Sequence, residues 1–337
     1  MNKPYGYWNE NKEKLQSLLD RGYTTKNDSD VFLKTFPDKN LEGIKRAAWR
    51  FCKDTLDRLK GKPPIIRDSE EELPPPTLKK LPKILVLDIE TSPMEGYFWR
   101  LYKQTILPHQ VIKDWAILTW SAKWLCDSEI MSEKVSIEEA EAREDMSIMQ
   151  PLWDLIEESD AIIGHNVAQF DLKKINTRFM INGLKPTTPY QIIDTYSTAK
   201  KHFAFSSNKM QYINTQLELE GKLETNFELW KRCVTGDASA LEYMEKYNKY
   251  DVKATEELYF MFRPWIKSHI NLGLYVQSYS PVCPNCGGFD LDWKDYYYTP
   301  AGKYKAFRCK TCGAIGRSRY SAYPKEKRGA LTRSVAR

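Results

Sequence analysis

Apolar residues recur at helical spacing along the first 60 positions of the chain. They form three stretches: Leu15, Leu18 and Leu19; Val31, Phe32, Leu33 and Phe36; and Ile44, Ala47, Ala48 and Phe51. Gly22 ends the first stretch, and the Pro37-Asp38 pair separates the second from the third. The pattern predicts a small N-terminal module of three helices over residues 1–60.

This periodicity stops between residues 61 and 82. The segment contains Lys62-Pro63-Pro64, the acidic run Glu70-Glu71-Glu72 and the run Pro74-Pro75-Pro76. A stretch so rich in proline and charge cannot build a core, and we expect an extended linker here.

Strand-like and helix-like stretches alternate from residue 83 to residue 271. The expected strands are apolar runs at residues 84–87, 115–124, 161–164 and 192–193. The expected helices have a longer apolar period and cover residues 146–158, 172–181 and 241–262. Such alternation predicts an α/β domain in which functional side chains gather at strand ends.

Two carboxylates directly follow the first of these strands. In Asp88-Ile89-Glu90, side chains alternate along the strand, so both acids share one face and Ile89 lies on the other. Two anions at this separation repel each other unless a divalent cation lies between them. Asp-x-Glu is a common sequence, so the pair indicates a metal site only in combination with acids further along the chain.

Two later segments combine a carboxylate with amide and aromatic side chains. Residues 166–171 have the sequence Asn-Val-Ala-Gln-Phe-Asp and follow the apolar run that ends at Gly164. Residues 247–251 have the sequence Tyr-Asn-Lys-Tyr-Asp and lie inside the last expected helix. Positions i and i+4 share one helix face, so Tyr247 and Asp251 should project in the same direction.

Three segments in this order resemble the exonuclease motifs of the DEDD superfamily: Asp88-x-Glu90, Asn166-x-x-x-Phe170-Asp171 and Tyr247-x-x-x-Asp251. That superfamily includes the proofreading 3′–5′ exonuclease domains of DNA polymerases. The resemblance covers residues 83–271 and implies a ribonuclease H-like mixed sheet flanked by helices. The third motif is similar to the Tyr-type subclass, since Lys246 stands where the His-type subclass has its histidine.

The resemblance implies phosphodiester hydrolysis with two Mg²⁺ or Mn²⁺ ions roughly 3.5–4 Å apart. Asp88 would be the bridging ligand, and Glu90 and Asp171 would complete either site directly or through water. Asp251 would hold the ion that activates the water, and the Tyr247 hydroxyl would orient that water. The products would be nucleoside 5′-monophosphates. On the same resemblance, Asn166 and Phe170 would contact the nucleic acid.

Other side chains near the motifs allow more than one interpretation. Asp194 ends an expected strand and would either support a metal ion indirectly or cap a helix. His165 is expected to pack or hydrogen-bond beside its strand rather than bind a metal ion. Phe98, Trp99 and Tyr102 follow the first motif and would either stack on terminal bases or pack in the core.

Four of the seven cysteines form two C-x-x-C pairs near the C-terminus. Cys283-Pro-Asn-Cys286 and Cys309-Lys-Thr-Cys312 are each followed by glycine, and 22 residues separate the two pairs. Each pair forms a tight turn that presents two thiolates, and four thiolates complete a tetrahedral Zn²⁺ site with no open position. The pattern resembles a zinc ribbon over residues 279–318 with one structural Zn²⁺.

Aromatic and basic residues are interleaved between the two cysteine pairs. Tyr296-Tyr297-Tyr298 and Lys303-Tyr304-Lys305 suit nucleic-acid binding, or alternatively stabilise a β-hairpin in a small module. The net charge of the chain is only +6, but residues 317–337 contain seven Lys or Arg and one Glu. This basic tail, residues 319–337, suits a polyanionic partner, although a solvated terminus has the same composition.

The predicted N-terminal helices, with Trp8 and a basic third helix, resemble a Myb/SANT-like helix-turn-helix module. The resemblance implies that Lys45, Arg46 and Arg50 of the third helix contact DNA. A helical bundle that docks on another protein is the alternative.

Composition indicates a soluble, intracellular protein. Apolar residues make up 42% of the chain and aromatic residues 13%, which suffices for a core. No apolar run reaches the length of a transmembrane helix, and the N-terminus lacks a signal-peptide core. The scattered Cys52, Cys126 and Cys233 indicate reduced thiols rather than a secreted disulfide framework.

These features lead to one hypothesis and two alternatives. We expect a 3′–5′ exonuclease that degrades DNA from single-stranded 3′ ends, similar to stand-alone exonucleases of phages or mobile elements. It would act in the cytoplasm (of the host, if phage-encoded) during replication or recombination, with a polymerase or replication protein as a partner in trans. The alternatives are an RNA 3′-end exoribonuclease and a DNA-binding regulator with a vestigial nuclease domain.

Overall fold

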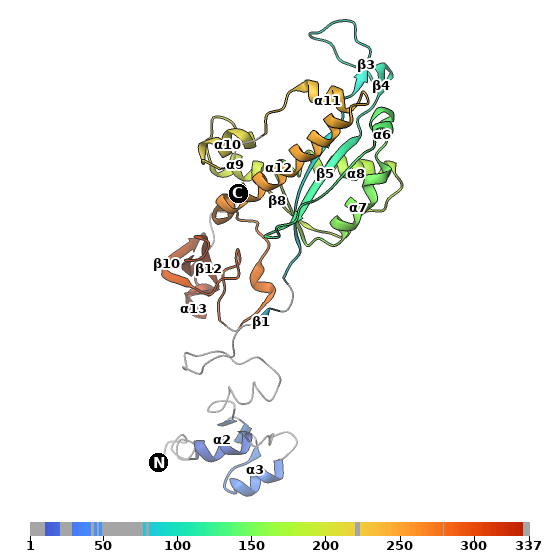
Figure 1. Cartoon of the computed structure of the whole chain (residues 1–337). Helices are drawn as coiled ribbons and strands as arrows, with labels where there is room; N and C mark the ends of the chain where they lie inside the picture. Colours follow the sequence, from blue (N-terminus) through green and yellow to red (C-terminus); the bar gives the residue numbers. More distant parts are fainter. Residues whose placement is uncertain are drawn as a thin grey trace. The chain divides into compact units, whose positions relative to one another are not determined.

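The computed structural model of the chain describes residues 11–20, 29–41, 44–45, 47–48, 77–78, 81–219, 223–278 and 280–332 (Figure 1). Contacts divide the chain into two compact units, Met1–Pro74 and Pro75–Arg337. The finer division into modules that the sequence predicts stays a prediction.

The first unit contains short helices that share an apolar core. Helices α2 (Lys12–Asp20) and α3 (Ser29–Thr35) coincide with the first two predicted stretches. In the third stretch, the described residues 41, 44–45 and 47–48 are helical. Buried side chains from all three segments form one cluster: Leu15, Leu19, Phe32, Phe36, Ile44, Ala47 and Ala48. The helical period therefore identified most of the inward-facing side chains, because burial selects the apolar stripe. Leu33 is an exception at 38% exposed, and Phe51 lies outside the described residues.

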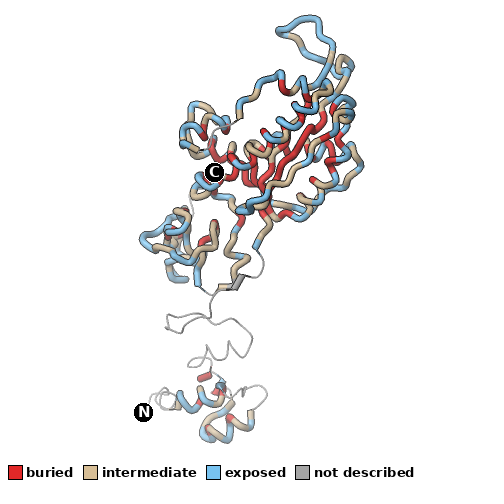
Figure 2. Tube along the Cα trace, viewed as in Figure 1, coloured by how far each residue is buried: buried red, intermediate tan, exposed pale blue. Residues whose placement is uncertain are grey.

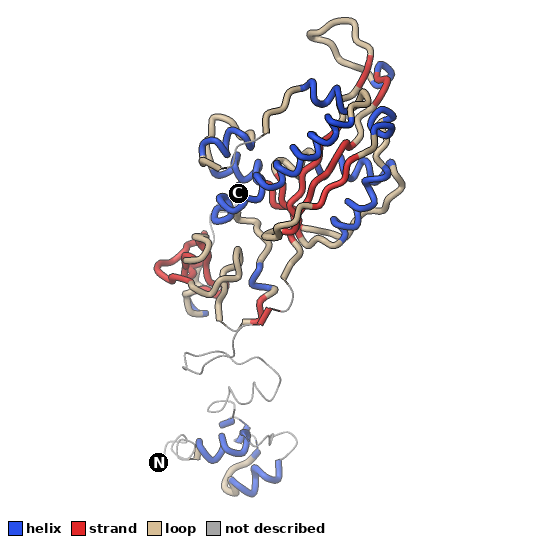
Figure 3. The backbone as a smooth tube through the Cα atoms, in the orientation of Figure 1, coloured by secondary structure: helices blue, strands red, loops and turns tan. Residues whose placement is uncertain are grey.

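A five-stranded mixed sheet organises the second unit (Figure 3). Its strands, in spatial order, are β6 (Met131–Lys134), β5 (Ile117–Trp124), β2 (Ile84–Thr91), β7 (Ala161–Gly164) and β8 (Gln191–Asp194). β5 runs antiparallel to both β6 and β2, whereas β7 is parallel to both β2 and β8. The four strands expected from the sequence are all present in this sheet, and β2 extends through both Asp88 and Glu90.

Helices cover both faces of this sheet, and the alternation along β2 decides which side chains meet which helices. Leu85, Leu87 and Ile89 point to the face covered by α7 (Met146–Glu157) and α8 (Asp171–Ile181). Ile84 and Val86 point to the other face, which is covered by the long helix α12 (Ala238–Phe262). The buried positions are concentrated in this sheet and in the helix faces that pack on it (Figure 2).

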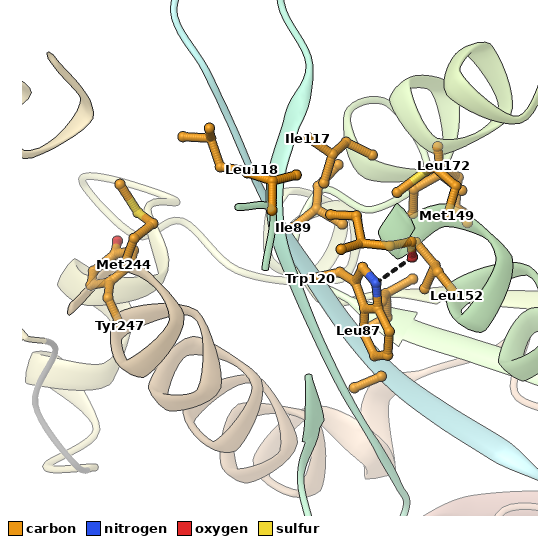
Figure 4. Packing of buried hydrophobic residues seen from close by; sticks show 14 of the residues in the cluster. Leu87, Ile89, Ile117, Leu118, Trp120, Met149, Leu152, Leu172, Met244 and Tyr247 are labelled. Carbon is orange, nitrogen blue, oxygen red and sulfur yellow. Dashed lines mark hydrogen bonds between the residues drawn. The ribbon is translucent and has the colours of Figure 1, made fainter. Parts of the chain in front are cut away.

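Figure 4 shows both layers from close by, with Met244 and Tyr247 on α12 and Met149, Leu152 and Leu172 on the opposite side of the strands. The indole of Trp120 donates a hydrogen bond to the Ile148 carbonyl at 2.8 Å, which ties β5 to α7.

Shorter elements complete the layer around α12 and the ends of the strands. They are α6 (Ile137–Ala142), α9 (Thr195–His202), α10 (Met210–Gln216), α11 (Phe227–Cys233) and the 3₁₀ helix η2 (Arg263–Trp265). Between β2 and β5 the chain forms a separate hairpin of β3 (Glu95–Gly96), η1 (Pro108–Gln110) and β4 (Val111–Lys113).

A small antiparallel sheet lies near the C-terminus. It consists of β10 (Leu291–Thr299), β11 (Gly302–Cys309) and β12 (Ile315–Ser321), followed by α13 (Lys325–Gly329). Before it, η3 (Leu272–Leu274) leads into β9 (Val276–Gln277), which pairs with β1 (Thr77–Leu78). β1 belongs to the predicted linker, residues 61–82. Its residue Leu78 lies opposite Val276, 198 positions further along the chain.

Within the described residues, no helix combines the length and the apolar character that crossing a bilayer requires.

Candidate functional site

Strand β2 presents Asp88 and Glu90 toward α12. Ile89 between them is 3% exposed and packs in the core on the opposite face, so the predicted alternation is confirmed. The antiparallel partners of the two acids on β5 are Ser121 and Thr119, which are both fully buried. The carboxylates therefore stand on a rigid central strand of the sheet and not on a loop.

Helix α12 brings a third carboxylate to the same place. Asp251 lies one turn after Tyr247, and both side chains are buried on the face of α12 that packs on the sheet. One ligand oxygen from each of Asp88, Glu90 and Asp251 lies within 4.8 Å of the other two. The first and third motifs, which are far apart in the sequence, thus form one acidic cluster.

Asn248 links the two elements that carry this cluster. Its Nδ2 donates a hydrogen bond to Asp88 Oδ2 at 2.7 Å, and its side chain is fully buried. The sequence motifs assign no role to this residue. The detectable feature is an amide within the buried stripe of the helix, since a buried polar group requires a partner.

Asp171, the carboxylate of the second motif, lies outside the group of three. It begins α8, is 3% exposed, and its Oδ1 accepts a hydrogen bond from the backbone N–H of Ile89 at 3.2 Å. β7 pairs with β2 only as far as Val86. The N–H of Ile89 lies beyond this pairing, and the Asp171 carboxylate is its hydrogen-bond acceptor. Its role as a metal ligand stays a prediction.

The surroundings of Asp171 raise its pKa to about 7. Burial is the main cause, and the nearby Asp194 carboxylate adds to it. The backbone N–H groups of Asp171 and Ile89 act in the opposite direction because they stabilise the ionised form.

Asp194 braces the turn of the second motif and caps α9. Its side chain accepts hydrogen bonds from the backbone N–H groups of Asn166, Ala168 and Ser197 at 3.2, 3.1 and 2.9 Å. Asn166 has φ +68°, a left-handed conformation that Asn tolerates better than most residues. Of the two interpretations of Asp194, the structure favours the helix cap.

His165 and Phe170 occupy the two ends of this turn. The ring nitrogens of His165 lie 3.0 Å from Thr195 Oγ1 and 2.9 Å from the Asn208 carbonyl oxygen, so His165 hydrogen-bonds beside its strand as expected. Phe170 is 40% exposed, and the Lys174 ammonium lies 5.1 Å from its ring centroid. An exposed ring next to a cation is available for contact with a ligand.

A family model described as RNase_H superfamily matches residues 125–262, which include Asp171, Tyr247 and Asp251. The protein therefore contains a ribonuclease H-like domain. The mixed sheet flanked by helices agrees with this assignment. Domains of this superfamily generally carry out nuclease chemistry with metal ions. A comparison with curated proteins finds no match.

A hollow of about 430 Å³ begins at Thr91, the residue after Glu90. It lies between the end of β2, at Thr91 to Pro93, and the first turns of α11, where Phe227 and Trp230 line it. The ring of Trp230 meets that of Tyr247 edge-on, with the centroids 6.3 Å apart. The ring of Trp230 therefore connects the hollow to Tyr247 of the third motif.

The three aromatic residues after the first motif are not part of the core. They lie in the hairpin between β2 and β5, which we call the arm (residues 94–113). Phe98 is 55% exposed, Trp99 94% and Tyr102 79%. The interpretation that these rings pack in the core was wrong, because the chain leaves the sheet after Thr91 and returns to it only at Ile117.

The four C-terminal cysteines converge outside the ribonuclease H-like domain. Their sulfur atoms lie within 4.8 Å of one another, with Cys283 and Cys312 at 3.7 Å and Cys286 and Cys309 at 3.5 Å. Gly287 and Gly313, which follow the two pairs, both have positive φ, as the tight turns require. This cluster is compatible with a zinc ribbon.

The thiols of the cluster differ in acidity. Burial raises the pKa of Cys286 to about 11. Burial also opposes ionisation of Cys309, but the backbone N–H of Cys312 and the thiol of Cys286 outweigh it, and the pKa of Cys309 falls to about 7.

The predicted DNA-contacting residues of the N-terminal module are only partly described. Lys45 is exposed on a helical segment, whereas Arg46 and Arg50 lie outside the described residues.

Proposed function

We propose that this protein is a 3′–5′ exonuclease that hydrolyses DNA and releases nucleoside 5′-monophosphates. The observation that carries the proposal is the cluster of Asp88, Glu90 and Asp251, with Tyr247 one turn before Asp251. This cluster belongs to a chain with a ribonuclease H-like domain. The order of the three motifs supports exonuclease chemistry.

The acidic cluster fits divalent cations of the Mg²⁺ or Mn²⁺ type. All its ligand atoms are carboxylate oxygens, the donors that these ions prefer, and three like charges within 4.8 Å are costly without a cation. Asp88, Glu90 and Asp251 would hold two such ions together with Asp171. When bound, these ions would supply positive charge that activates water and stabilises the leaving 3′ oxygen.

The protein side chains would position the reactants. The Tyr247 hydroxyl would orient the water that adds to the terminal phosphorus, while the bond to the 3′ oxygen of the penultimate nucleotide breaks. Asn166 and the exposed ring of Phe170 would contact the terminal nucleotides. Asn248 would hold the Asp88 carboxylate through its hydrogen bond.

The flanking parts of the chain would contribute stability and DNA affinity. One Zn²⁺ held by Cys283, Cys286, Cys309 and Cys312 would be structural, because four thiolates leave no open coordination position. Lys45, Arg46 and Arg50 would contact DNA from the N-terminal module. The resemblance to stand-alone exonucleases supports a role in replication or recombination.

Matched DNA and RNA oligonucleotides, labelled at the 5′ end and incubated with Mn²⁺, test the proposal directly. We expect a ladder that shortens from the 3′ end of DNA, and no ladder with Asp88→Ala. Glu242→Ala removes an exposed acid from the same helix, α12, and serves as the matched control that should cleave normally. A ladder on RNA alone would support 3′–5′ exonuclease chemistry but would show that DNA is not the substrate.

DNA binding by Asp251→Ala separates an enzyme from a regulator. We expect this variant to lose cleavage and to keep most of its affinity for single-stranded DNA. If the unchanged protein binds DNA tightly and cleaves neither polymer with Mg²⁺ or Mn²⁺, the proposed activity is wrong and a regulator is favoured.

A further inference from the structure

The arm (residues 94–113) presents exposed aromatic rings from an ordered backbone. The Tyr97 N–H donates to the Gln110 carbonyl at 2.8 Å, and the Gln110 side chain amide donates back to the Tyr97 carbonyl at 3.2 Å. At the tip, the Trp99 N–H donates to Gln104 Oε1 at 3.2 Å, and Lys103 adopts φ +52° in the turn. The exposed rings are therefore presented by a closed hairpin.

The charge of the arm is one-sided. Between Glu95 and Asp114 the sequence contains no Asp or Glu. Arg100 and Lys103 are exposed at the tip, next to the exposed rings of Trp99 and Tyr102. Exposed aromatic rings interleaved with cations, and without any anion, fit the bases and phosphates of a single-stranded nucleic acid.

Glu95 and Asp114, the acids at the root of the arm, do not cancel the positive charge at its tip. Glu95 lies 4.0 Å from the guanidinium of Arg143. Asp114 acts electrostatically on Lys174, whose ammonium lies 3.6 Å from the Trp115 ring centroid. Each of these acids therefore has a cation of the ribonuclease H-like domain nearby, and the tip keeps its positive charge.

The arm also lines a hollow of about 720 Å³. Two acids at the root of the arm, Glu95 and Asp114, are part of its lining. Its apolar lining comes from the arm itself: Met94, Phe98, Ile106, Pro108, Val111 and Ile112. Four of these six side chains are among the exposed large hydrophobic residues of the chain: Met94, Phe98, Ile106 and Ile112. Apolar side chains around a hollow favour stacked bases over a hydrated polar ligand.

The position of the arm connects it to the acidic cluster. It begins four residues after Glu90 on the same chain segment, and the pairs Thr91 with Ile117 and Ser92 with Ala116 anchor its root to the sheet. The hollow lined by Phe227 and Trp230 lies at this root and reaches Tyr247 through the ring of Trp230. In Figure 1 the loop between β3 and β4 projects beyond the end of the sheet.

We propose that the arm is a stacking platform that binds the single strand several nucleotides upstream of the 3′ end held at the acidic cluster. This inference rests on the proposed exonuclease function for its polarity, since the 3′ end must lie at Asp88 and Glu90. The rings of Trp99 and Tyr102 stack on bases, and Arg100 and Lys103 contact phosphates.

Binding is measured apart from cleavage, in the Asp88→Ala background without divalent cations. The probe is a single-stranded DNA oligonucleotide of about 16 nucleotides. We expect Trp99→Ala with Tyr102→Ala to weaken binding by about 10-fold or more, because stacking on one ring has an effect of this size. Trp99→Phe with Tyr102→Phe keeps two aromatic rings and should bind within about 2-fold of the background.

Three further measurements make the test specific. Met180→Ala removes an 81% exposed apolar side chain from α8 and should leave binding unchanged. Arg100→Gln and Lys103→Gln should each reduce the salt dependence of binding by about one phosphate contact. The loss caused by the double alanine variant should disappear as the oligonucleotide is shortened to two or three nucleotides.

The outcomes separate this inference from the proposed activity. Unchanged affinity of the double alanine variant would overturn the platform, and the apolar arm would then be assigned to a protein partner, even if the unchanged protein degrades DNA. An equal loss on the shortest oligonucleotides would also overturn it, since the effect would then lie at the acidic cluster. Arm-dependent binding without any cleavage would sustain the platform and contradict the exonuclease.

Discussion

Asn248 on α12 and Asp88 on β2 are joined by a hydrogen bond of 2.7 Å, although 160 positions separate them in the sequence. Asn248 is fully buried and lies three residues before Asp251. The amide therefore fixes the orientation of one carboxylate of the acidic cluster from the helix that carries another.

Replacing Asn248 by alanine should weaken the response to metal ions. Without the amide, Asp88 loses a fixed orientation, and groups that orient metal ligands typically change affinity or activity by about 10–100-fold. We expect the Mn²⁺ concentration at half-maximal cleavage to rise by this factor, with kcat partly restored at saturating Mn²⁺. Glu242→Ala, an exposed change on the same helix, is the control. A lower melting temperature with an unchanged Mn²⁺ response would reduce Asn248 to a structural role.

The Tyr247 hydroxyl should affect the rate of cleavage and not the fold. Tyr247→Phe keeps the ring, which packs in the core with Trp230 edge-on to it. We expect kcat to fall by about 100-fold, at the low end of the range for groups that orient or activate a reactant. Single-turnover cleavage with Mn²⁺ measures this, and the melting temperature should stay the same. An unchanged rate would remove Tyr247 from the mechanism.

Glu245 should make the stability of the domain depend on pH. Burial opposes its ionisation, but Lys134, Lys249 and Ser132 outweigh burial and lower its pKa from 4.5 to about 2. Because the pKa is lower in the folded state, the unfolded chain binds more protons below pH 4.5. The stabilisation is therefore complete above pH 4.5 and is lost as the pH falls toward 2.

Glu245→Gln tests this dependence. Solvent reaches this group, so we expect the free energy of unfolding to fall by only about 1 kcal/mol at neutral pH. The difference between the two proteins should shrink in urea unfolding curves at about pH 3. A difference that is constant between these pH values would show that the charge of Glu245 is not the stabilising feature.

Cys309→Ser should release the Zn²⁺ that we propose at the four cysteines, without dismantling the acidic cluster. Three thiolates bind Zn²⁺ less tightly than four. The cysteines are also the main part of the buried cluster of the small sheet β10–β12, beside Leu291, Ala314 and the packed rings of Trp293 and Phe307. We expect zinc to appear in a chelator assay and an early unfolding step to develop. Cys126→Ser, outside the cluster, is the control. Loss of Mn²⁺-dependent cleavage of short oligonucleotides would contradict the independence of the two sites.

Local patterns explain why much of this fold could be predicted. The runs at 84–87 and 161–164 became β2 and β7, and the long helical period became α12, because burial imposes the periods of strand and helix on apolar residues. The same local geometry placed Asp88 and Glu90 on one face and Tyr247 one turn before Asp251. Each C-x-x-C pair forms its own turn for a similarly local reason, and the pairing of β10 with β11 then helps to bring the two pairs together.

The sequence by itself determined the acidic motifs and their order. It also determined whether a strand or a helix carries each one, because strands and helices impose periods of two and of about four residues on apolar positions. Only the tertiary structure decided that Asn248 meets Asp88, that Asp171 binds the Ile89 N–H and that Asp194 accepts from the N–H groups of Asn166 and Ala168. It also decided that the rings of the arm are exposed. These contacts depend on how helices and loops pack across the sheet, and packing joins residues whose separation along the chain leaves no periodic pattern.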